Sequence, residues 1–308
     1  MRDTLISQLT ALAKKDPSIV LITGDLGFGV LNDYANDLPG QFLNAGVAEQ
    51  NMTGIATGLA LEGKKVFTYS IGNFNTLRCL EQIRNDACYH DANVNIISIG
   101  GGFSYGQLGF SHHATEDYGI LNTLPGISIF TPGSKKETVS CLESALKIDN
   151  VCYLRIDKSD FEDNYNDIDD ISLPREIIEG SDFLVVGVGG VIEEAIFARK
   201  EIKERFSIEI GVVSIPQLKP LDSTSLEKII SKYGTIITIE EHNLVNGLSS
   251  MMKQLCFDAS LGDKKIYSLG INDSISTVVG DQKYLRNKFG ISSKEIIEIV
   301  RDANEKNY

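Results

Sequence analysis

Short runs of β-branched and apolar residues alternate with helical segments along most of the chain, and this alternation most constrains its fold. Several of these runs are apolar at every position, which is typical of parallel strands covered by helices on both faces. The pattern therefore predicts layered α/β architecture. In the first half we predict strands at 19–23, 65–69, 94–99, 127–130 and 151–155, and helices at 49–61, 75–89 and 135–148.

The alternation lapses in the stretch SDFEDNYNDIDDISLP, which is acidic and ends in proline. We interpret it as a linker whose acids form a solvated charge run. The alternation then restarts, with predicted strands at 183–188, 208–214, 235–240 and 265–269 and helices at 191–205, 223–233, 245–257 and after 292. This organisation predicts two parallel or mixed-sheet α/β domains, at residues 1–160 and 176–308, joined by a linker at 161–175.

Composition excludes several classes of protein. The 308 residues carry a net charge of −13, which argues against binding to nucleic acid or to an anionic membrane surface. No apolar run approaches the roughly 20 residues of a membrane span, and the N-terminal segment lacks the apolar core of a signal peptide. The five cysteines contain no CxxC pair and are interpreted as reduced thiols, so we expect a cytoplasmic protein.

The densest local signal is the segment FLNAGVAEQNMTGIATGLA, at residues 42–60. Here Glu49 stands where a glycine-containing loop turns into a helix of small residues. Gly54 and Gly58 lie one turn apart, so that face can approach another backbone closely. Taken alone, the segment is better explained by an interface helix whose N-terminal glutamate is favoured by the helix dipole.

The string GVAEQNMTGIATGLA closely resembles the pyrimidine-binding domain of transketolases and 1-deoxyxylulose-5-phosphate synthases. The resemblance implies thiamine diphosphate as cofactor, with Glu49 as a catalytic residue that hydrogen-bonds a nitrogen of the cofactor's aminopyrimidine ring. That role needs a carboxyl group able to share a proton in a site that excludes water.

The next block, YSIGNFNTLRCLEQIRN, is similar to the family's FxTxRAxDQIRN segment. The resemblance implies that Phe74 stacks on the pyrimidine ring, and Arg78 is assigned to the same cofactor-binding set. Core packing is the alternative for a lone phenylalanine after a strand. Asp25 lies on the family's ADL segment, which lines the cofactor cleft.

A glycine-rich loop, GGGFSYGQLGFSHHATED, follows the predicted strand at 94–99. In transketolases the histidine of a THQ segment in this region contacts the sugar, and His112 matches it best. His113 and Gln107 are assigned to substrate binding with it, although both histidines could instead be bonded to the loop backbone. Arg155 aligns with an arginine that grips substrate phosphate, and a structural salt bridge is an equal alternative.

Two positions of this loop depart from the family. The histidine that helps to bind sugar phosphate falls near Gly100, and the aspartate that reads a donor hydroxyl falls on Leu108. An apolar side chain in place of the aspartate suggests a deoxygenated or otherwise modified sugar.

The GDG motif, which holds the cofactor's diphosphate through Mg²⁺, is missing from the sequence. The resemblance covers only the latter two of transketolase's three domains, and it implies a partner subunit that carries GDG and binds most of the Mg²⁺. An α2β2 heterotetramer with a contact between two β chains is expected, and no metal ligands are assigned to this chain.

The second half resembles the transketolase C-terminal domain through KPLD and EEHNLVNGL, and its GVGG is therefore not interpreted as a nucleotide loop. Glu240, Glu241 and His242 are not expected to bind one metal ion, because neighbouring strand residues point to opposite faces.

These observations predict the catalytic subunit of a thiamine-diphosphate-dependent transketolase, which transfers a two-carbon ketol unit between sugars and is active only with its partner. Two alternatives remain open at this stage. One is the β subunit of a 2-oxo-acid dehydrogenase, and the other is a non-catalytic assembly subunit that kept the fold.

Overall fold

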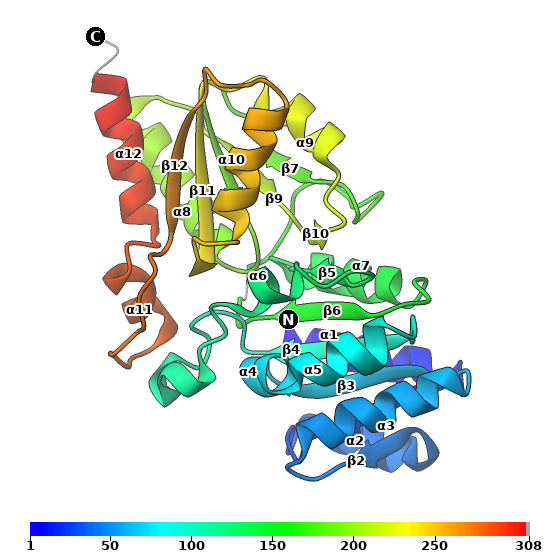
Figure 1. Cartoon of the computed structure of the whole chain (residues 1–308). Coiled ribbons are helices and arrows are strands. Elements are labelled where there is room, and N and C mark those ends of the chain that lie inside the picture. The colour runs from blue at the N-terminus through cyan, green and yellow to red at the C-terminus, as the bar shows by residue number, and fades with distance from the viewer. Residues whose placement is uncertain (160, 306–308) are drawn as a thin grey trace.

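The computed structural model describes residues 1–159 and 161–305, and these form two α/β domains stacked one above the other (Figure 1). The first domain is built on a seven-stranded sheet with the order β10-β5-β6-β4-β3-β1-β2. All neighbouring strands of this sheet are parallel except β10, which runs antiparallel to β5. Its strands are β1 (Ile19–Thr23), β2 (Phe42–Asn44), β3 (Lys65–Ile71), β4 (Val94–Ile99), β5 (Ser128–Phe130), β6 (Cys152–Ile156) and β10 (Gln217–Lys219).

Helices cover both faces of this sheet, as the continuously apolar strands require. One face packs against α1 (Arg2–Ala13) and α7 (Lys135–Ala145). The other packs against α3 (Glu49–Leu61) and the helical turns that follow β3. Two short helices, α2 (Asn32–Asp37) and α6 (Asp117–Leu121), lie in the connections.

The prediction of one regular helix at 75–89 is wrong, because the segment forms several short helical pieces. It is divided into α4 (Gly72–Asn75), a 3-10 turn η2 (Leu77–Cys79), α5 (Leu80–Gln82) and a π-helical turn η3 (Ile83–Cys88). The side chain of Asn75 donates to the Ile97 carbonyl (2.9 Å), and the Thr76 hydroxyl donates to the Gly72 carbonyl (2.6 Å). Such side-chain bonds compete with helix bonds, and the backbone leaves helical geometry at Thr76, with φ −124° and ψ −79°.

The second domain has a five-stranded sheet with the order β12-β11-β8-β9-β7, parallel except for the β7–β9 pair. The predicted two-domain α/β class is therefore confirmed, with mixed sheets. Its strands are β7 (Arg175–Ile178), β8 (Phe183–Gly187), β9 (Gly211–Ser214), β11 (Thr235–Asn243) and β12 (Lys265–Ile271). Its helices are α8 (Ile192–Phe206), α9 (Ser223–Ile230), α10 (Leu248–Asp258), α11 (Gln282–Lys288) and α12 (Ser293–Glu305).

The acidic segment before β7 is not simply solvated, as the sequence suggested. Asp163 has a buried side chain that pairs with Arg175 and accepts a hydrogen bond from the Ser134 hydroxyl (3.1 Å). Only some of its acids are surface groups: Asp167, for example, is exposed and pairs with Lys136. Asp163 therefore links the segment to the first domain through Ser134 and to the second domain through Arg175, the first residue of β7.

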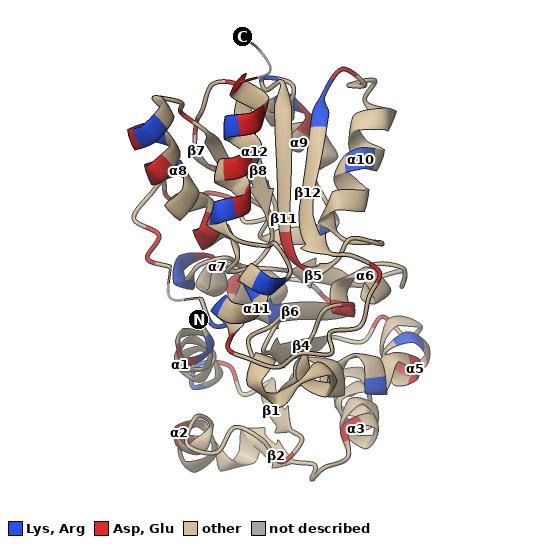
Figure 2. Ribbon diagram, turned by 90° about the vertical axis from the view of Figure 1, so that its left-hand side faces the viewer, with Lys and Arg blue, Asp and Glu red and all other residues tan. Residues whose placement is uncertain are grey.

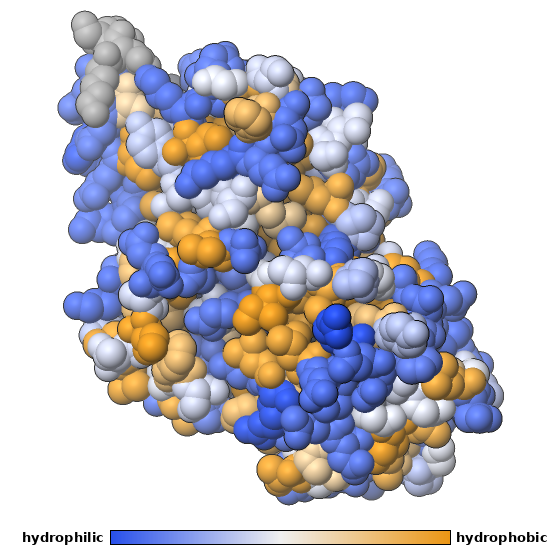
Figure 3. All heavy atoms as spheres, in the orientation of Figure 1, coloured by the Kyte–Doolittle hydropathy of each residue, from blue (hydrophilic) through white to orange (hydrophobic). Residues whose placement is uncertain are grey.

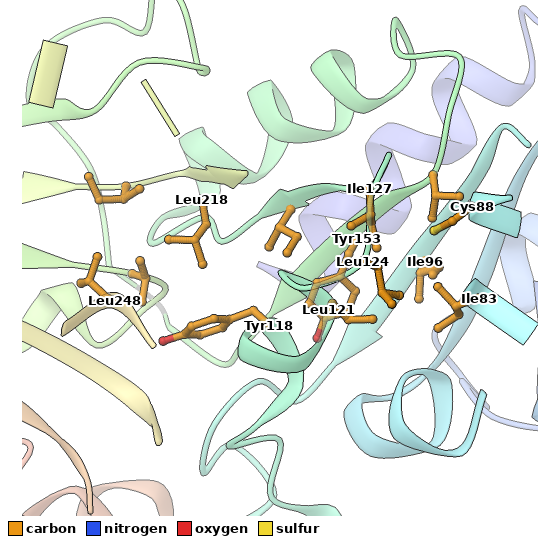
Figure 4. Packing of buried hydrophobic residues seen from close by; sticks show 14 of the residues in the cluster. Ile83, Cys88, Ile96, Tyr118, Leu121, Leu124, Ile127, Tyr153, Leu218 and Leu248 are labelled. Carbon is orange, nitrogen blue, oxygen red and sulfur yellow. The ribbon is translucent and has the colours of Figure 1, made fainter. Parts of the chain in front are cut away.

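One of the hydrophobic clusters is continuous between the two domains. A single cluster of buried side chains runs from Ile83 and Cys88 on the helical side of the first sheet, through Tyr118, to Leu218 and Leu248 (Figure 4). Among the helices of the described residues, none is long and apolar enough to cross a membrane.

Polar groups are buried beside this shared core at the domain junction. The Tyr118 hydroxyl donates to Glu240 Oε2 (2.5 Å), and its ring stacks on His242 with 3.7 Å between centroids. Glu240 also accepts the backbone N–H groups of Leu248 (2.7 Å) and Ser249 (2.8 Å), which begin α10. Burial raises the pKa of Glu240 to about 7 and lowers that of His242 to about 4.

We predict that Glu240→Gln changes how stability depends on pH. The ordinary pKa of the Glu240 carboxyl is 4.5, so below this pH it is protonated in both the folded and the unfolded protein. Between pH 4.5 and about 7 the unfolded protein releases this proton and the folded protein keeps it, so the free energy of unfolding falls as the pH rises. The wild type should therefore lose up to about 3 kcal/mol relative to Glu240→Gln across this window, at about 1.4 kcal/mol for each pH unit. Urea unfolding at pH 5, 6, 7 and 8 measures the difference, and a difference that stays constant with pH contradicts the prediction.

Candidate active site

Glu49 is the first residue of α3, and its side chain is only 2% exposed. It lies against the carboxyl end of β1, where Gly24 follows the strand. A Cβ built on Gly24 would lie 3.2 Å from Glu49 Cγ, so the absence of a side chain at Gly24 makes room for the acid. The carboxylate is thus held away from water at the edge where the strands of the first sheet end.

Arg78 and Phe74 complete the surroundings of this acid. Arg78 Nη1 donates to Glu49 Oε2 (2.7 Å), and its guanidinium carbon lies 4.4 Å from the centre of the Phe74 ring. Gln50, the next residue of α3, donates to the Arg78 carbonyl (3.1 Å) and fixes that residue relative to the helix. The guanidinium, whose side chain is 45% exposed, therefore lies between the buried acid and the aromatic ring.

Asp25 follows Gly24 and is fixed by hydrogen bonds to the last residue of β2. It has a positive φ of 57°, which a small polar residue tolerates better than most. Asn44, at the end of β2, donates to Asp25 Oδ1 (2.9 Å) and accepts from the backbone N–H groups of Asp25 (3.1 Å) and Gly46 (3.0 Å). Asn44 was not singled out from the sequence, since no local pattern marks it.

The loop after β4 brings His112 to the same place. Its ring meets the Phe74 ring edge-on, with 5.1 Å between centroids, and the Ser111 hydroxyl lies 3.0 Å from His112 Nδ1. The structure therefore gathers Glu49, Phe74, Arg78 and His112, four of the residues assigned from the sequence, from three separate segments of the chain.

The neighbouring histidine has different surroundings. His113 is fully buried, its Nε2 lies 3.2 Å from the Gly106 carbonyl, and its ring packs edge-on against Phe103. Burial lowers its pKa from the ordinary value of 6.5. Gln107, in the turn η4 (Gly106–Leu108), is exposed. Of these two residues assigned to substrate binding, only Gln107 has a side chain at the surface.

Arg155 is occupied within the chain. Its Nε donates to Asp117 Oδ2 (2.9 Å), and its Nη2 donates to the carbonyls of Ala114 (2.9 Å) and Glu241 (3.0 Å). The side chain is 2% exposed and lies at the domain junction. This geometry is the structural salt bridge that the sequence offered as an alternative to phosphate binding. The structure does not bring Arg155 to the surface around Glu49.

Glu240 and His242 lie on one face of β11, toward Tyr118, and Glu241 lies on the other, toward Phe103. This matches the alternation expected from the sequence. Among the described residues there is no group of three or more His, Cys, Asp or Glu side chains that could hold a metal ion.

Comparisons with known proteins define the family. Residues 1–163 match the transketolase pyrimidine binding domain, and residues 175–296 match the transketolase C-terminal domain. The chain belongs to the transketolase family.

Relatives of this chain include separate transketolase subunits. It is 32% identical to a subunit of the apulose-4-phosphate transketolase of Phocaeicola vulgatus, over 82% of this chain and 81% of the relative. It is 27% identical to the 6-deoxy-6-sulfo-D-fructose transketolase subunit SqwH of a Clostridium species, over 99% and 95% of the two chains.

A solved structure described as a split gene transketolase, inactive beta4 tetramer, superposes with a TM-score of 0.85 at 28% identity and covers 98% of this chain and 97% of that one. By contrast, the 1-deoxy-D-xylulose-5-phosphate synthase of Desulfitobacterium hafniense, 28% identical over 94% of this chain, is matched over only 46% of its own length.

We predict that Arg155→Ala lowers the free energy of unfolding by about 3–5 kcal/mol, because it leaves Asp117 as an uncompensated buried charge. Urea unfolding measures the loss. Arg199→Ala, which removes a partly exposed pair with Glu209, is the matched control and should cost less than about 1 kcal/mol. Wild-type stability of Arg155→Ala would contradict the prediction and show that the buried pair with Asp117 does not stabilise the domain junction.

Proposed function

We propose that this chain is the catalytic subunit of a thiamine-diphosphate-dependent transketolase, which transfers a two-carbon ketol unit from a modified sugar and works only with a partner subunit. The observation that carries the proposal is the buried carboxylate of Glu49, placed at the start of α3 beside the aromatic ring of Phe74. A decarboxylating 2-oxo-acid dehydrogenase has the same type of domains, and it becomes an outcome of the tests below.

The residues of the site fit the aminopyrimidine ring of the cofactor. Arg78 presents a flat group that donates N–H to Glu49 and stacks on Phe74. A flat heteroaromatic ring with N–H donors offers the same two contacts, so the guanidinium marks a space of the right shape and chemistry. The Arg78 side chain is 45% exposed, so its displacement by the ring would not require a fully buried charge to move into water.

Each residue then has a definite task. Bound thiamine diphosphate would supply the carbon nucleophile that carries the two-carbon unit. Glu49 would hold a proton between its carboxyl group and a ring nitrogen, Phe74 would orient the ring by stacking, and His112 would contact the sugar beside Phe74. Gly24 leaves room for the carboxyl group, and the burial of Glu49 keeps water from the proton-sharing atoms.

Several features support a partner subunit. This chain spans about half the length of the 1-deoxy-D-xylulose-5-phosphate synthase relative, and relatives of its own length are named as subunits. Gly54 and Gly58 are exposed on α3, with open space where each Cβ would be. The face in Figure 3 also shows apolar residues gathered over the region of α5 and α6, as at surfaces that associate. We propose that the partner carries the diphosphate and Mg²⁺ site, in an α2β2 assembly with a contact between β chains.

A modified sugar is favoured by the loop after β4. Leu108, at the position where the family has an aspartate, is 56% exposed and close to the segment of His112. The two relatives above are named for apulose 4-phosphate and for 6-deoxy-6-sulfo-D-fructose. A cytoplasmic location is part of the same proposal.

We predict that Glu49→Ala reduces turnover of the assembled enzyme by about 10²–10⁴-fold, because the proton at the ring nitrogen loses its acceptor. The assay reconstitutes the chain with a partner that carries the GDG motif, thiamine diphosphate and Mg²⁺. Glu62→Ala, at the exposed end of the same helix, is the matched control and should retain wild-type turnover. Near-normal turnover of folded, assembled Glu49→Ala would remove the basis of the proposal.

Donor preference is tested on the same assembly. We expect kcat/KM for apulose 4-phosphate or 6-deoxy-6-sulfofructose to exceed that for xylulose 5-phosphate by about tenfold or more, because a site that lacks the hydroxyl-reading carboxylate does not favour the ordinary donor. Leu108→Asp should shift the ratio toward xylulose 5-phosphate, and Leu173→Asp, an exposed apolar position elsewhere, should not. Full activity on xylulose 5-phosphate with none on modified donors, or decarboxylation of pyruvate, would refute the assignment.

A further inference from the structure

The loop that carries His112 has little regular structure of its own. It leaves β4 at Gly100, is closed by the paired backbones of Gly102 and Ala114 (2.9 and 3.0 Å), and contains only the 3-10 turns η4 and η5 (Phe110–His112). Short turns of this kind do not fix a loop by themselves, so its shape depends on contacts from outside.

One outside contact comes from a buried carboxylate of the second domain. Oε2 of Glu241, a residue of β11, accepts the backbone N–H of Phe103 (2.8 Å). A Cβ on Gly102, which has a φ of 61°, would clash with the same oxygen. Only glycine at this position leaves room for the carboxylate, so loop and strand fit each other at one point.

Glu241 is itself held by α11. Gln282 Nε2 lies 3.0 and 3.1 Å from its two carboxylate oxygens, and Arg286 pairs with it through Nε. Arg286 also pairs with Glu193 (2.6 Å) and Glu194 (3.2 Å), which fixes α11 against α8. Figure 2 shows the acidic end of β11 facing the first domain, with basic residues of α11 close by.

Further contacts carry this constraint along the loop. The Phe103 ring packs edge-on against His113 (5.3 Å), whose Nε2 lies 3.2 Å from the Gly106 carbonyl. Asn73, beside Phe74, donates to the His113 carbonyl (2.6 Å). Phe103, whose N–H Glu241 binds, is therefore joined to His113, the neighbour of His112, and through His113 to Asn73 in the segment of Phe74.

We propose that Glu241 is a positioning residue of the C-terminal domain: it fixes loop 103–112 so that His112 faces Phe74 and Glu49. The role of His112 in sugar binding rests on the function proposed above. The restraint of the loop by Glu241 does not depend on that function. The second domain thereby acts on substrate binding through the loop that carries His112.

Hydrogen–deuterium exchange on the purified chain tests the hold directly. In Glu241→Ala the amides of residues 103–112 should exchange about tenfold or more faster, because Phe103 N–H loses a charged acceptor. Glu241→Gln, which keeps one acceptor oxygen, should show a smaller increase. Glu240→Gln is the matched control: it is the adjacent buried acid and also bonds across the domain junction, to Tyr118, but not to this loop.

Kinetics on the assembled enzyme test the consequence for the site. Glu241→Ala should raise the KM for the donor sugar by about tenfold, with thiamine diphosphate binding by calorimetry unchanged, because the loop misplaces His112 and leaves Glu49 in position. Glu241→Gln should restore part of the loss, which general destabilisation would not reproduce. Should Glu241→Ala fail to fold, Gln282→Ala, which removes only a neighbour of the carboxylate, should change both readouts in the same direction.

Unchanged exchange of residues 103–112 in Glu241→Ala overturns the proposal, and so does an unchanged KM in an active assembly. A wild-type assembly that is inactive on every donor sugar refutes the proposed function instead, and the exchange experiment then decides whether Glu241 holds the loop.

Discussion

The site depends on the exclusion of water from one carboxylate. Glu49 begins α3 directly beneath the end of β1, and Gly24 presents no side chain that would displace it. A buried carboxylate is costly unless it is paired or hydrogen-bonded, and in this chain Arg78 provides the partner. The energy that keeps the acid buried comes from the packing of α3 and the sheet, so the chemistry of this one group is set by the core beneath it.

A second constraint links that core to the rest of the chain. The apolar cluster under α3 continues through Tyr118 into the C-terminal domain, and the end of β11 lies against the loops that follow the strands of the first sheet. Glu240 and His242 bind the helical segment around Tyr118, whereas Glu241 binds the loop of His112. Adjacent residues of one strand thus hold two different segments of the first domain, because strand side chains alternate between faces.

Much of this architecture was predictable from the sequence, and what escaped prediction has physical reasons. The apolar runs gave the inner strands, and α3 was placed at 49–61 as observed. The edge strands β2, β7 and β10 were missed because each is short and its pairing is decided by distant partners. The helix predicted at 75–89 is interrupted at Thr76, where the side chains of Asn75 and Thr76 bond to backbone carbonyls outside that range, which periodicity does not reveal.

The same division holds for the site. Glu49, Phe74, Arg78 and His112 were found through local strings and lie together, but the strings could not show that Arg155 and His113 are buried. Asn44, Asn73 and Glu241 support the loops from other segments of the chain, and such support is visible only in three dimensions.

The short strand β10 has a consequence for any attempt to exchange parts of this protein. It belongs by sequence to the second half, yet it forms the outer edge of the first sheet by pairing with β5. A chimera joined at the acidic segment 161–175 would pair its inherited β5 with a foreign β10, and a truncation there would leave the backbone of β5 open to another chain. The acidic segment is therefore unsuitable as a boundary for domain exchange, and the two domains should be exchanged together.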